Sequence, residues 1–503
     1  MHSDISAKLR IIFKKQVFSY KFIYYNARFF QKNVYLCHRK GYKYSQTQQP
    51  NMNNDRKNMS RREFLRRLGI GTGSAVALMA MEPLRAIAQD EKKESKAENR
   101  MTYRVQHGSG KQVSLLGFGM MRLPNDQEEV NRLVDYAIQH GVNYFDTAPI
   151  YMQGQSEVLT GNALSRYPRE KYFVATKMSN MWGDTGLDGA KEMYETSMKK
   201  LRVDYIDYYL LHGIGNGGMD SFNNRFINNG LLDFLLKERE AGRIRHLGFS
   251  YHGDVRVFDW LLDHQSEYHW DFCQIQMNYL DWQHASMKRG RRGGDADAEY
   301  LYSKCEKTGV QCVVMEPLRG GALGKVSDDI VKELQAMRPD DSPVRWAFRW
   351  VGSYPNILTA LSGMNRMDHL EENVKTFSPL EVCTEAENAL LAKIADQMSG
   401  VPTIPCTTCA YCMPCPYGVD IPGNFAYYND AVKNHVLPLP EPSAADYAER
   451  QKQFIEGYRN ALPNAEKWAR SCQDCEECLS KCPQQIRIPN QLARIVETLR
   501  VRR

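Results

Sequence analysis

The sequence lacks three features that would each place a chain in a common class of protein. No Gly-x-Gly-x-x-Gly follows the first apolar run that reads as a strand, residues 113–119, so a Rossmann domain has no dinucleotide fingerprint here. The apolar stretch from Leu68 to Met81 is too short and too rich in glycine for a good transmembrane helix. Residues 89–503 hold 49 basic and 55 acidic residues, so the body of the chain offers no excess of positive charge for binding a nucleic acid.

The positive charge that the chain does carry is concentrated at its N-terminal end, where residues 1–88 hold 17 basic and 4 acidic residues. Residues 59–88 contain a charged segment, a modest apolar stretch and the sequence Ala86-Ile87-Ala88, in that order. This order is typical of a signal peptide and predicts cleavage after Ala88. The other interpretation is an ordinary basic amphipathic helix.

The charged segment from Ser60 to Arg66 resembles the twin-arginine export signal. The resemblance implies a precursor that the twin-arginine export machinery carries to the periplasm, already folded around its cofactor. Without a functional signal the protein would remain in the cytoplasm. Because such a signal normally lies near the start of translation, we expect translation to begin at Met52 or Met59. Residues 1–58 would then be a start-site error or a disordered extension.

Eight short apolar runs alternate with amphipathic stretches between Val113 and Phe377. The runs are VSLLGFG, VNYFDTA, YFVATK, YIDYYLLH, IRHLGFS, FCQIQMNY, VQCVVMEPL and ILTALSG. Eight strands with helices between them favour an α/β fold, a (β/α)8 TIM barrel over residues 102–377. The stretch TYRVQHGSGKQVSLL before the first barrel strand predicts a hairpin that closes the barrel floor. Residues 378–503 are left for a second domain.

Polar side chains stand where successive predicted strands end, and in such a barrel the chemistry belongs at the C-terminal ends of the strands. The second run ends at Asp146, with Tyr151 in the loop beyond it. The third run ends at Lys177 and the fourth at His212. Each residue alone has a structural explanation, such as an aspartate that caps a turn or a histidine in the core. Four titratable groups above three successive strands are harder to explain in that way and predict an active site.

The segment DTAPIY, residues 146–151, together with Lys177 and His212 resembles the catalytic tetrad of the aldo-keto reductase superfamily, in order and in strand position. The later segments MEPLRGGALG and LEENV resemble that superfamily's cofactor-binding segments. More narrowly, the whole chain is similar to bacterial aldo-keto reductases that carry a C-terminal ferredoxin-type iron–sulfur domain. The resemblance therefore implies a mainly helical 4Fe-4S domain over residues 378–503.

Reduction of a carbonyl by hydride requires a proton donor beside the oxygen that becomes negative. A phenol has a pKa of about 10, and a nearby ammonium lowers it. We therefore expect Tyr151 to be the acid, Lys177 to lower its pKa and Asp146 to anchor Lys177. His212 would hydrogen-bond the carbonyl oxygen and orient a small carbonyl or alcohol substrate. A nicotinamide nucleotide would supply the hydride.

The resemblance also implies where the nucleotide would bind. It assigns seven residues: Ser250 and Gln274 at the carboxamide, Met315 against the nicotinamide ring, Pro317, Leu318 and Arg319 along the pyrophosphate, and Asn373 at the adenine. The positions that carry basic residues in NADP-specific members hold Gly363 and His369 here, although Arg366 could substitute. Both NADP and NAD therefore stay open as cofactors.

Eight of the 13 cysteines fall in two runs near the C-terminal end. The second run has the full bacterial ferredoxin spacing, whereas the first run has the same triplet but only two residues before its fourth cysteine. In two-cluster ferredoxins the fourth cysteine of each run ligates the other run's cluster. This pattern assigns one [4Fe–4S] cluster to Cys406, Cys409, Cys412 and Cys482, and a second to Cys472, Cys475, Cys478 and Cys415.

Three alternatives stay open for these eight thiols. Zinc sites with four cysteine ligands use paired Cys-x-x-Cys motifs. A single cluster would leave thiols spare. Disulfides suit an exported protein, although thiols spaced three residues apart make poor partners. Of the other cysteines, Cys273, Cys305 and Cys312 lie in or beside predicted barrel elements and are expected to fill the core.

Two functions are consistent with these observations. The first is an enzyme that interconverts a carbonyl and an alcohol, with iron–sulfur clusters that relay electrons to or from an external carrier. The second is a non-enzymatic redox sensor or electron-transfer module, in which the barrel is a nucleotide-binding scaffold. The intact tetrad favours the enzyme, because a sensor would not need all four groups. A cluster domain that is purely structural is a third possibility.

Overall fold

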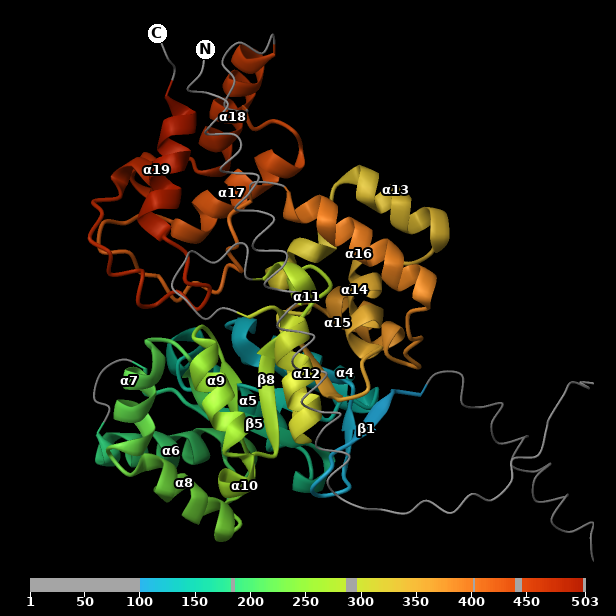
Figure 1. Ribbon diagram of the computed structural model, residues 1–503, viewed down its shortest axis with the longest axis vertical. Helices are drawn as coiled ribbons and strands as arrows, with labels where there is room; N and C mark the ends of the chain where they lie inside the picture. Colours follow the sequence, from blue (N-terminus) through green and yellow to red (C-terminus); the bar gives the residue numbers. More distant parts are fainter. Residues whose placement is uncertain (1–99, 182–185, 286–295, 401–402, 439–445, 501–503) are drawn as a thin grey trace, which may run out of the picture. The chain divides into compact units, whose positions relative to one another are not determined.

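Eight parallel strands close into a barrel in the computed structural model (Figure 1), which describes residues 100–181, 186–285, 296–400, 403–438 and 446–500. Successive strands pair with each other, and the last pairs with the first. The strands are β3 (Leu116–Gly119), β4 (Tyr144–Asp146), β5 (Phe173–Met178), β6 (Ile206–Ile214), β7 (Ile244–Tyr251), β8 (Phe272–Gln276), β9 (Gln311–Met315) and β10 (Ile357–Ser362). Each overlaps one of the eight predicted runs, and β5, β6 and β7 extend one or two residues beyond theirs, so the (β/α)8 prediction is confirmed.

The barrel strands are apolar along most of their length because both of their faces are covered. Every residue of β6 is buried, for example. Aromatic rings from three strands meet inside the barrel, where the ring centroid of Tyr208 lies 4.9 Å from that of Tyr144 and 5.2 Å from that of Phe272. The interior is therefore a packed core, and open space is expected only at the strand ends.

A hairpin of β1 (Tyr103–Val105) and β2 (Gln112–Ser114) precedes the barrel, as the sequence predicted. Gln311, the first residue of β9, accepts a hydrogen bond from the His107 backbone N–H at 2.8 Å and donates to the Val105 carbonyl at 3.0 Å. Because β9 begins at this residue, the hairpin lies at the N-terminal ends of the strands. It closes the floor of the barrel and leaves the opposite end for a site.

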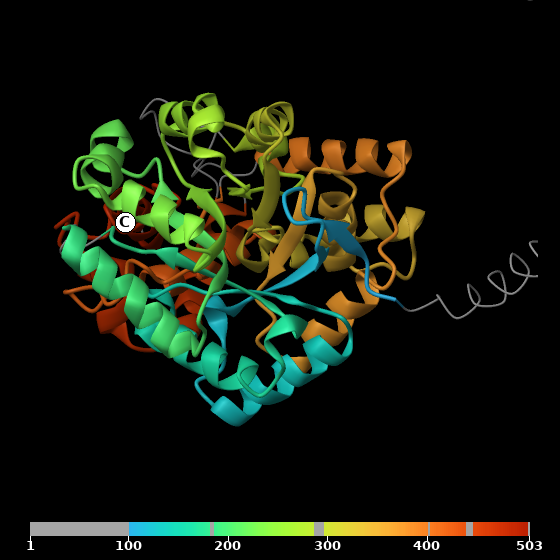
Figure 2. The same ribbon diagram turned by 90° about the horizontal axis from the view of Figure 1, so that it is seen from below.

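Helices surround the strands (Figure 2). Those between Gln127 and Thr376 are α4 (Gln127–Gln139), α5 (Gln155–Leu164), α6 (Leu187–Leu201), α7 (Gly218–Phe222), α8 (Leu231–Glu240), α9 (Val255–Asp263), α10 (Gln265–Tyr268), α11 (Asp281–His284), α12 (Ala298–Thr308), α13 (Asp328–Met337), α14 (Pro343–Gly352) and α15 (Met367–Thr376). None of the described helices has the length and hydropathy that crossing a membrane requires.

Helix α16 (Glu385–Ser399) follows the boundary that the sequence placed after residue 377, yet it packs into the core of the barrel through Leu391 and Ile394. A capping box starts this helix, in which Glu387 accepts from the Thr384 backbone N–H at 2.7 Å. The same carboxylate accepts from the guanidinium of Arg349 on α14 at 3.0 Å, and the Arg349 side chain is completely buried. The cap and the ion pair together fix α16 on the barrel.

A second hydrophobic core begins at Ile404. It is built by three helices: α17 (Ile421–Lys433), α18 (Tyr447–Ala461) and α19 (Ile488–Leu499). The rings of Phe454 and Tyr458 on α18 are fully buried in it, and six of the clustered cysteines pack against it. The second domain is therefore mainly helical, as predicted. The predicted signal peptide and the segment before it lie outside the described residues.

Candidate active site and cluster-binding sites

The carboxylate of Asp146 and the ammonium of Lys177 form a buried ion pair above the barrel. Asp146 is the last residue of β4, and Lys177 is the penultimate residue of the adjacent β5. Lys177 Nζ donates to Asp146 Oδ1 at 2.6 Å and to the Thr147 carbonyl at 2.8 Å. Burial raises the pKa of Asp146 and lowers that of Lys177, and the ion pair opposes both shifts.

Tyr151 begins the short helix η2 (Tyr151–Gly154) in the loop after β4, and its ring lies over the same ion pair. Lys177 Nζ is 4.9 Å from the centroid of this ring. The ring of His212, from β6, meets it edge-on with centroids 6.0 Å apart. The structure therefore brings together all four residues that the sequence singled out, from two adjacent strand ends, one loop and a third strand.

His212 is held in one orientation by neighbours behind it. Its Nδ1 lies 2.6 Å from Ser179 Oγ, and its carbonyl accepts from Arg225 Nη2 at 2.5 Å. Burial, reinforced by the positive charge of Lys177, holds the pKa of His212 well below its usual value. The imidazole is therefore neutral near pH 7, and its second ring nitrogen is left to interact with a substrate. Neither Ser179 nor Arg225 was picked out from the sequence, although Ser179 follows Lys177 by only two positions.

Burial opposes the predicted acidity of the Tyr151 phenol. Burial, followed by the neighbouring Tyr411 and Asp146, raises the pKa of Tyr151 well above 10. The ammonium that was expected to lower this pKa has its charge taken up by Asp146 and by a backbone carbonyl. The role of Lys177 in lowering the pKa of Tyr151 thus stays a prediction, while the structure does bring the two residues together.

A cavity of about 720 Å³ opens above Tyr151 and His212, within the usual range for small-molecule sites. Five of the seven residues predicted to bind a nucleotide line it: Gln274, Met315, Pro317, Leu318 and Asn373. They come from the ends of β8 and β9 and from α15, so one elongated ligand could contact all of them. The residues present thus fit a nicotinamide nucleotide.

The other two predicted nucleotide contacts lie outside this lining. Ser250 Oγ accepts from the Gly213 backbone N–H at 3.0 Å, which positions the β6 strand end. Arg319 forms an ion pair with Asp281, with Nε and Oδ1 3.3 Å apart. Arg366, the proposed substitute for the 2′-phosphate contact, does line the cavity, but its side chain is 68% exposed and pairs with Asp368. The cavity therefore does not decide between NADP and NAD.

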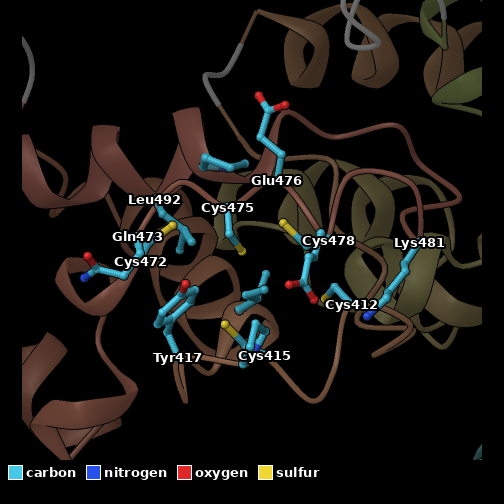
Figure 3. Close-up of a pocket in the computed structure, with 14 residues that line it drawn as sticks. Cys412, Cys415, Tyr417, Cys472, Gln473, Cys475, Glu476, Cys478, Lys481 and Leu492 are labelled. Carbon is cyan, nitrogen blue, oxygen red and sulfur yellow. The ribbon is translucent and has the colours of Figure 1, made fainter.

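Cysteines from both runs line two neighbouring pockets: Cys406, Cys409, Cys412 and Cys482 line one, and Cys412, Cys415, Cys472, Cys475 and Cys478 line the other. Cys482 lies within electrostatic range of Cys406 and Cys409, and also of Cys412. Cys415 lies in the same range of Cys472 and Cys478. Figure 3 shows the pocket that Cys415, Cys472, Cys475 and Cys478 line, with Cys412 of the first group and Tyr417 also in its lining.

The arrangement of the thiols fits clusters better than the alternatives. All eight thiols are free, and the described residues contain no disulfide among them. Within the described ranges no three His, Cys, Asp or Glu side chains converge closely enough for a single metal ion such as zinc. The four cysteines of a [4Fe–4S] cluster each bind a different iron, so they stand further apart than the ligands of one ion. The spacing of the thiols therefore fits [4Fe–4S] ligation, and the number of clusters stays a prediction.

The first group of cysteines reaches the active-site cavity, which the sequence did not predict. Thr407, Cys409 and Tyr411 line the cavity together with the barrel residues, and so do Pro483, the last residue of the second run, and the next residue, Gln484. A side-chain hydrogen bond joins Tyr411 to Tyr151. Residues from both cysteine runs thus form part of the site. The sequence carries no clear signal for the contact between Tyr411 and Tyr151, because a tyrosine between two clustered cysteines could equally pack against its own domain.

Family models match both parts of the chain. The model of the aldo/keto reductase family matches residues 115–396, more than half of the chain. A model described as a 4Fe-4S dicluster domain matches residues 405–487. The matched ranges coincide with the barrel plus α16 and with the part that holds all eight clustered cysteines.

Several proteins share part of this sequence. "Probable aldo-keto reductase 1" of Glycine max is 37% identical over 154 residues, which are 28% of this chain and 42% of that relative. The uncharacterized oxidoreductase YqkF of Bacillus subtilis is 36% identical over 110 residues, 20% of this chain and 35% of the relative. The chain thus spans less than half the length of these two curated relatives. A solved aldo-keto reductase from Bacillus halodurans, in its holo form, is 25% identical with a TM-score of 0.47, covering 59% of this chain and 96% of its own.

Proposed function

Because the chain belongs to the aldo/keto reductase family, we propose that it is a nicotinamide-dependent oxidoreductase that interconverts a small carbonyl compound and its alcohol. One observation supports this proposal above the others. Tyr151, His212, Lys177 and Asp146 converge at one end of the barrel, at the rim of a cavity lined by five predicted nucleotide contacts. A scaffold that only bound a nucleotide would need no such group of donors.

The roles of the four residues follow from their positions. Tyr151 would donate the proton to the carbonyl oxygen as the carbon accepts a hydride, so that one O–H bond breaks at the phenol and another forms on the product. The second ring nitrogen of neutral His212 would hydrogen-bond the same oxygen. Lys177, held by Asp146, would stabilise the phenolate that remains. NADP or NAD, when bound, supplies the hydride chemistry.

The iron–sulfur domain extends this proposal to electron transfer. When bound, [4Fe–4S] clusters transfer single electrons, and Cys409 of the first group lines the same cavity as Tyr151. This proximity supports a relay between the active site and an external electron carrier. The twin-arginine-like segment supports export of the folded precursor to the periplasm, where a relay would allow a bound nucleotide to be regenerated. Mass spectrometry of periplasmic protein would test the export proposal, with a mature N-terminus after Ala88 as the expected result.

Replacement of Tyr151 by phenylalanine tests the proposed chemistry directly. The variant keeps the ring and its packing but loses the proton donor, so turnover of aldehydes with NADPH or NADH is expected to fall by about 100-fold or more. The matched control is Tyr300→Phe, because Tyr300 is 44% exposed on α12, donates its hydroxyl to Asp259 and is not among the residues that line the cavity. Equal turnover of Tyr151→Phe and the parent protein would contradict the enzymatic proposal and favour the redox-sensor alternative.

A further inference from the structure

The loop from Cys406 to Cys412 belongs to the iron–sulfur domain, yet it forms a wall of the active-site cavity. Four of its residues line the cavity: Thr407, Thr408, Cys409 and Tyr411. Thr408 and Ala410 adopt left-handed backbone conformations, with φ of 53° and 61°, which non-glycine residues adopt only at a cost. A loop with two such residues has a defined shape, and its flanking cysteines are the residues that a cluster would hold.

Contacts on the barrel side match the shape of this loop. Arg122 Nη2 donates to the Thr407 carbonyl at 2.5 Å. Gly320, with φ of +67°, lies so close that a Cβ at this position would be 2.6 Å from the Thr407 oxygen. Just after the second cysteine run, Gln484 Nε2 donates to Gln276 Oε1 at 3.1 Å, and both side chains are buried. These contacts bring the loop close to the barrel and hold it there.

The loop brings the hydroxyl of Tyr411 to the hydroxyl of Tyr151, and the two side chains are hydrogen-bonded. A substrate carbonyl oxygen must approach the same Tyr151 hydroxyl in order to receive its proton. A phenol carries one hydrogen and therefore donates one hydrogen bond at a time. The Tyr411 oxygen and a substrate oxygen thus compete for one position.

We propose that Tyr411 gates the carbonyl site: its hydroxyl holds the position on Tyr151 that a substrate oxygen takes, and substrate binding requires this contact to be given up. The inference rests on the proposed carbonyl–alcohol activity and adds to it a specificity-determining residue from outside the barrel. Because cysteines flank Tyr411 on both sides, the ring can leave mainly by rotating its side chain. The gate therefore favours slender carbonyl compounds, which need little extra room.

Binding of 4-nitrobenzaldehyde to the anaerobically purified holoprotein with NADP⁺ or NAD⁺ tests the gate. The oxidised nucleotide cannot reduce the aldehyde, so tryptophan fluorescence or calorimetry reports a dissociation constant without turnover. Tyr411→Phe keeps the ring and removes the competing hydroxyl, and we expect its dissociation constant for the aldehyde to fall by about threefold to tenfold, the effect of one net hydrogen bond. Nucleotide affinity, iron content and the electron paramagnetic resonance spectrum are expected to match those of the parent protein.

Tyr417→Phe is the matched control, because Tyr417 is 48% exposed and lines the pocket of the other cysteine group. It is expected to leave aldehyde affinity unchanged. Should Tyr411→Phe lose iron, Tyr411→Leu provides a second variant without the hydroxyl. If an iron-replete Tyr411 variant binds the aldehyde no more tightly than the parent protein, the proposed gate is wrong, while the proposed carbonyl–alcohol activity is unaffected. If neither the parent nor the variant binds the aldehyde although both bind nucleotide, the proposed carbonyl site fails and the gate fails with it.

Discussion

Lys177 Nζ lies 2.6 Å from Asp146 Oδ1, and both side chains are almost completely buried at the ends of adjacent strands. Lys177→Met would leave the Asp146 carboxylate buried without its cation. We expect the free energy of unfolding to fall by about 3–5 kcal/mol, because an unpaired buried charge costs more than the pair contributes. Urea unfolding followed by circular dichroism measures this loss.

The double variant Lys177→Met/Asp146→Leu removes both charges and is the control for this explanation. Its stability is expected to exceed that of Lys177→Met, because no charge is left buried alone. Both variants should lose activity. A double variant that is less stable than the single variant would mean that the cost lies in packing and not in charge.

The crossed cysteine groups predict which substitutions affect the same cluster. Cys482→Ser should have the same effect as Cys409→Ser, although Cys482 belongs to the other run of the sequence. Cys415→Ser should likewise match Cys475→Ser. Each is expected to lower iron content by up to about half, because the proposed assignment places each pair of substitutions on one of two clusters. Electron paramagnetic resonance after dithionite reduction distinguishes the two clusters, and Cys305→Ser in the barrel core should retain all of the iron.

Glu387 links α16 to the barrel and predicts how stability changes in acid. Burial alone would raise its pKa, but hydrogen bonds from Arg349, the Thr384 backbone and Arg338 lower the pKa from 4.5 to about 2. A depressed pKa means that the ionised carboxylate stabilises the fold above pH 4.5 and that this contribution is lost as the pH falls toward 2. Glu387→Gln is therefore expected to cost about 3 kcal/mol at pH 7 and much less at pH 3.

Chemical unfolding of the parent protein and Glu387→Gln at both pH values checks this prediction. The exposed Glu385, at the start of the same helix, provides a control, because Glu385→Gln should change stability little at either pH. A difference between the parent protein and Glu387→Gln that is the same at pH 7 and pH 3 would show that the hydrogen-bond geometry, and not the charge, carries the effect.

Substitutions at two adjacent glycines distinguish the cost of losing the contact with the iron–sulfur domain from the cost of a left-handed backbone. Gly320 and Gly321 both have positive φ, but a Cβ at Gly320 would collide with the Thr407 backbone whereas one at Gly321 would meet open space. Gly321→Ala should therefore cost about 1–2 kcal/mol through its left-handed backbone alone. Gly320→Ala should cost more and should also shift the spectrum of the first cluster. Equal effects of the two substitutions, measured by thermal unfolding and electron paramagnetic resonance, would show that the contact with Thr407 is loose.

The barrel and most of its site could be predicted from the sequence because each depends on local pattern. Strands covered on both faces read as continuous apolar runs, and strand ends place Asp146, Lys177 and His212 at one rim. The 4Fe-4S domain likewise followed from cysteine spacing, whereas the crossed assignment of its ligands stays a prediction. What local pattern could not give depends on burial and on contacts between distant segments. The pKa of Tyr151 rises because the site is enclosed and because Tyr411, 260 positions further along the chain, lies beside it.

The positions of Arg319 and α16 also could not be predicted from local pattern. Arg319 turns to Asp281 because a carboxylate from a different loop is nearby and buried. Helix α16 joins the barrel core because Glu387 meets the buried Arg349 of α14. Predicting either position would require knowing which residues surround a charged side chain in the folded protein.

The wall that residues 407–411 contribute to the cavity has a consequence for maturation of the protein. The barrel can complete its own hydrophobic core from residues 101–395, but the mouth of the cavity is finished only when the loop between Cys406 and Cys412 takes its shape. Cys406 and Cys412, at the two ends of that loop, are residues that would hold the iron of a cluster. A newly made chain in an iron-starved cell would thus have a folded barrel but an incomplete active-site cavity. Its activity would then depend on the supply of iron.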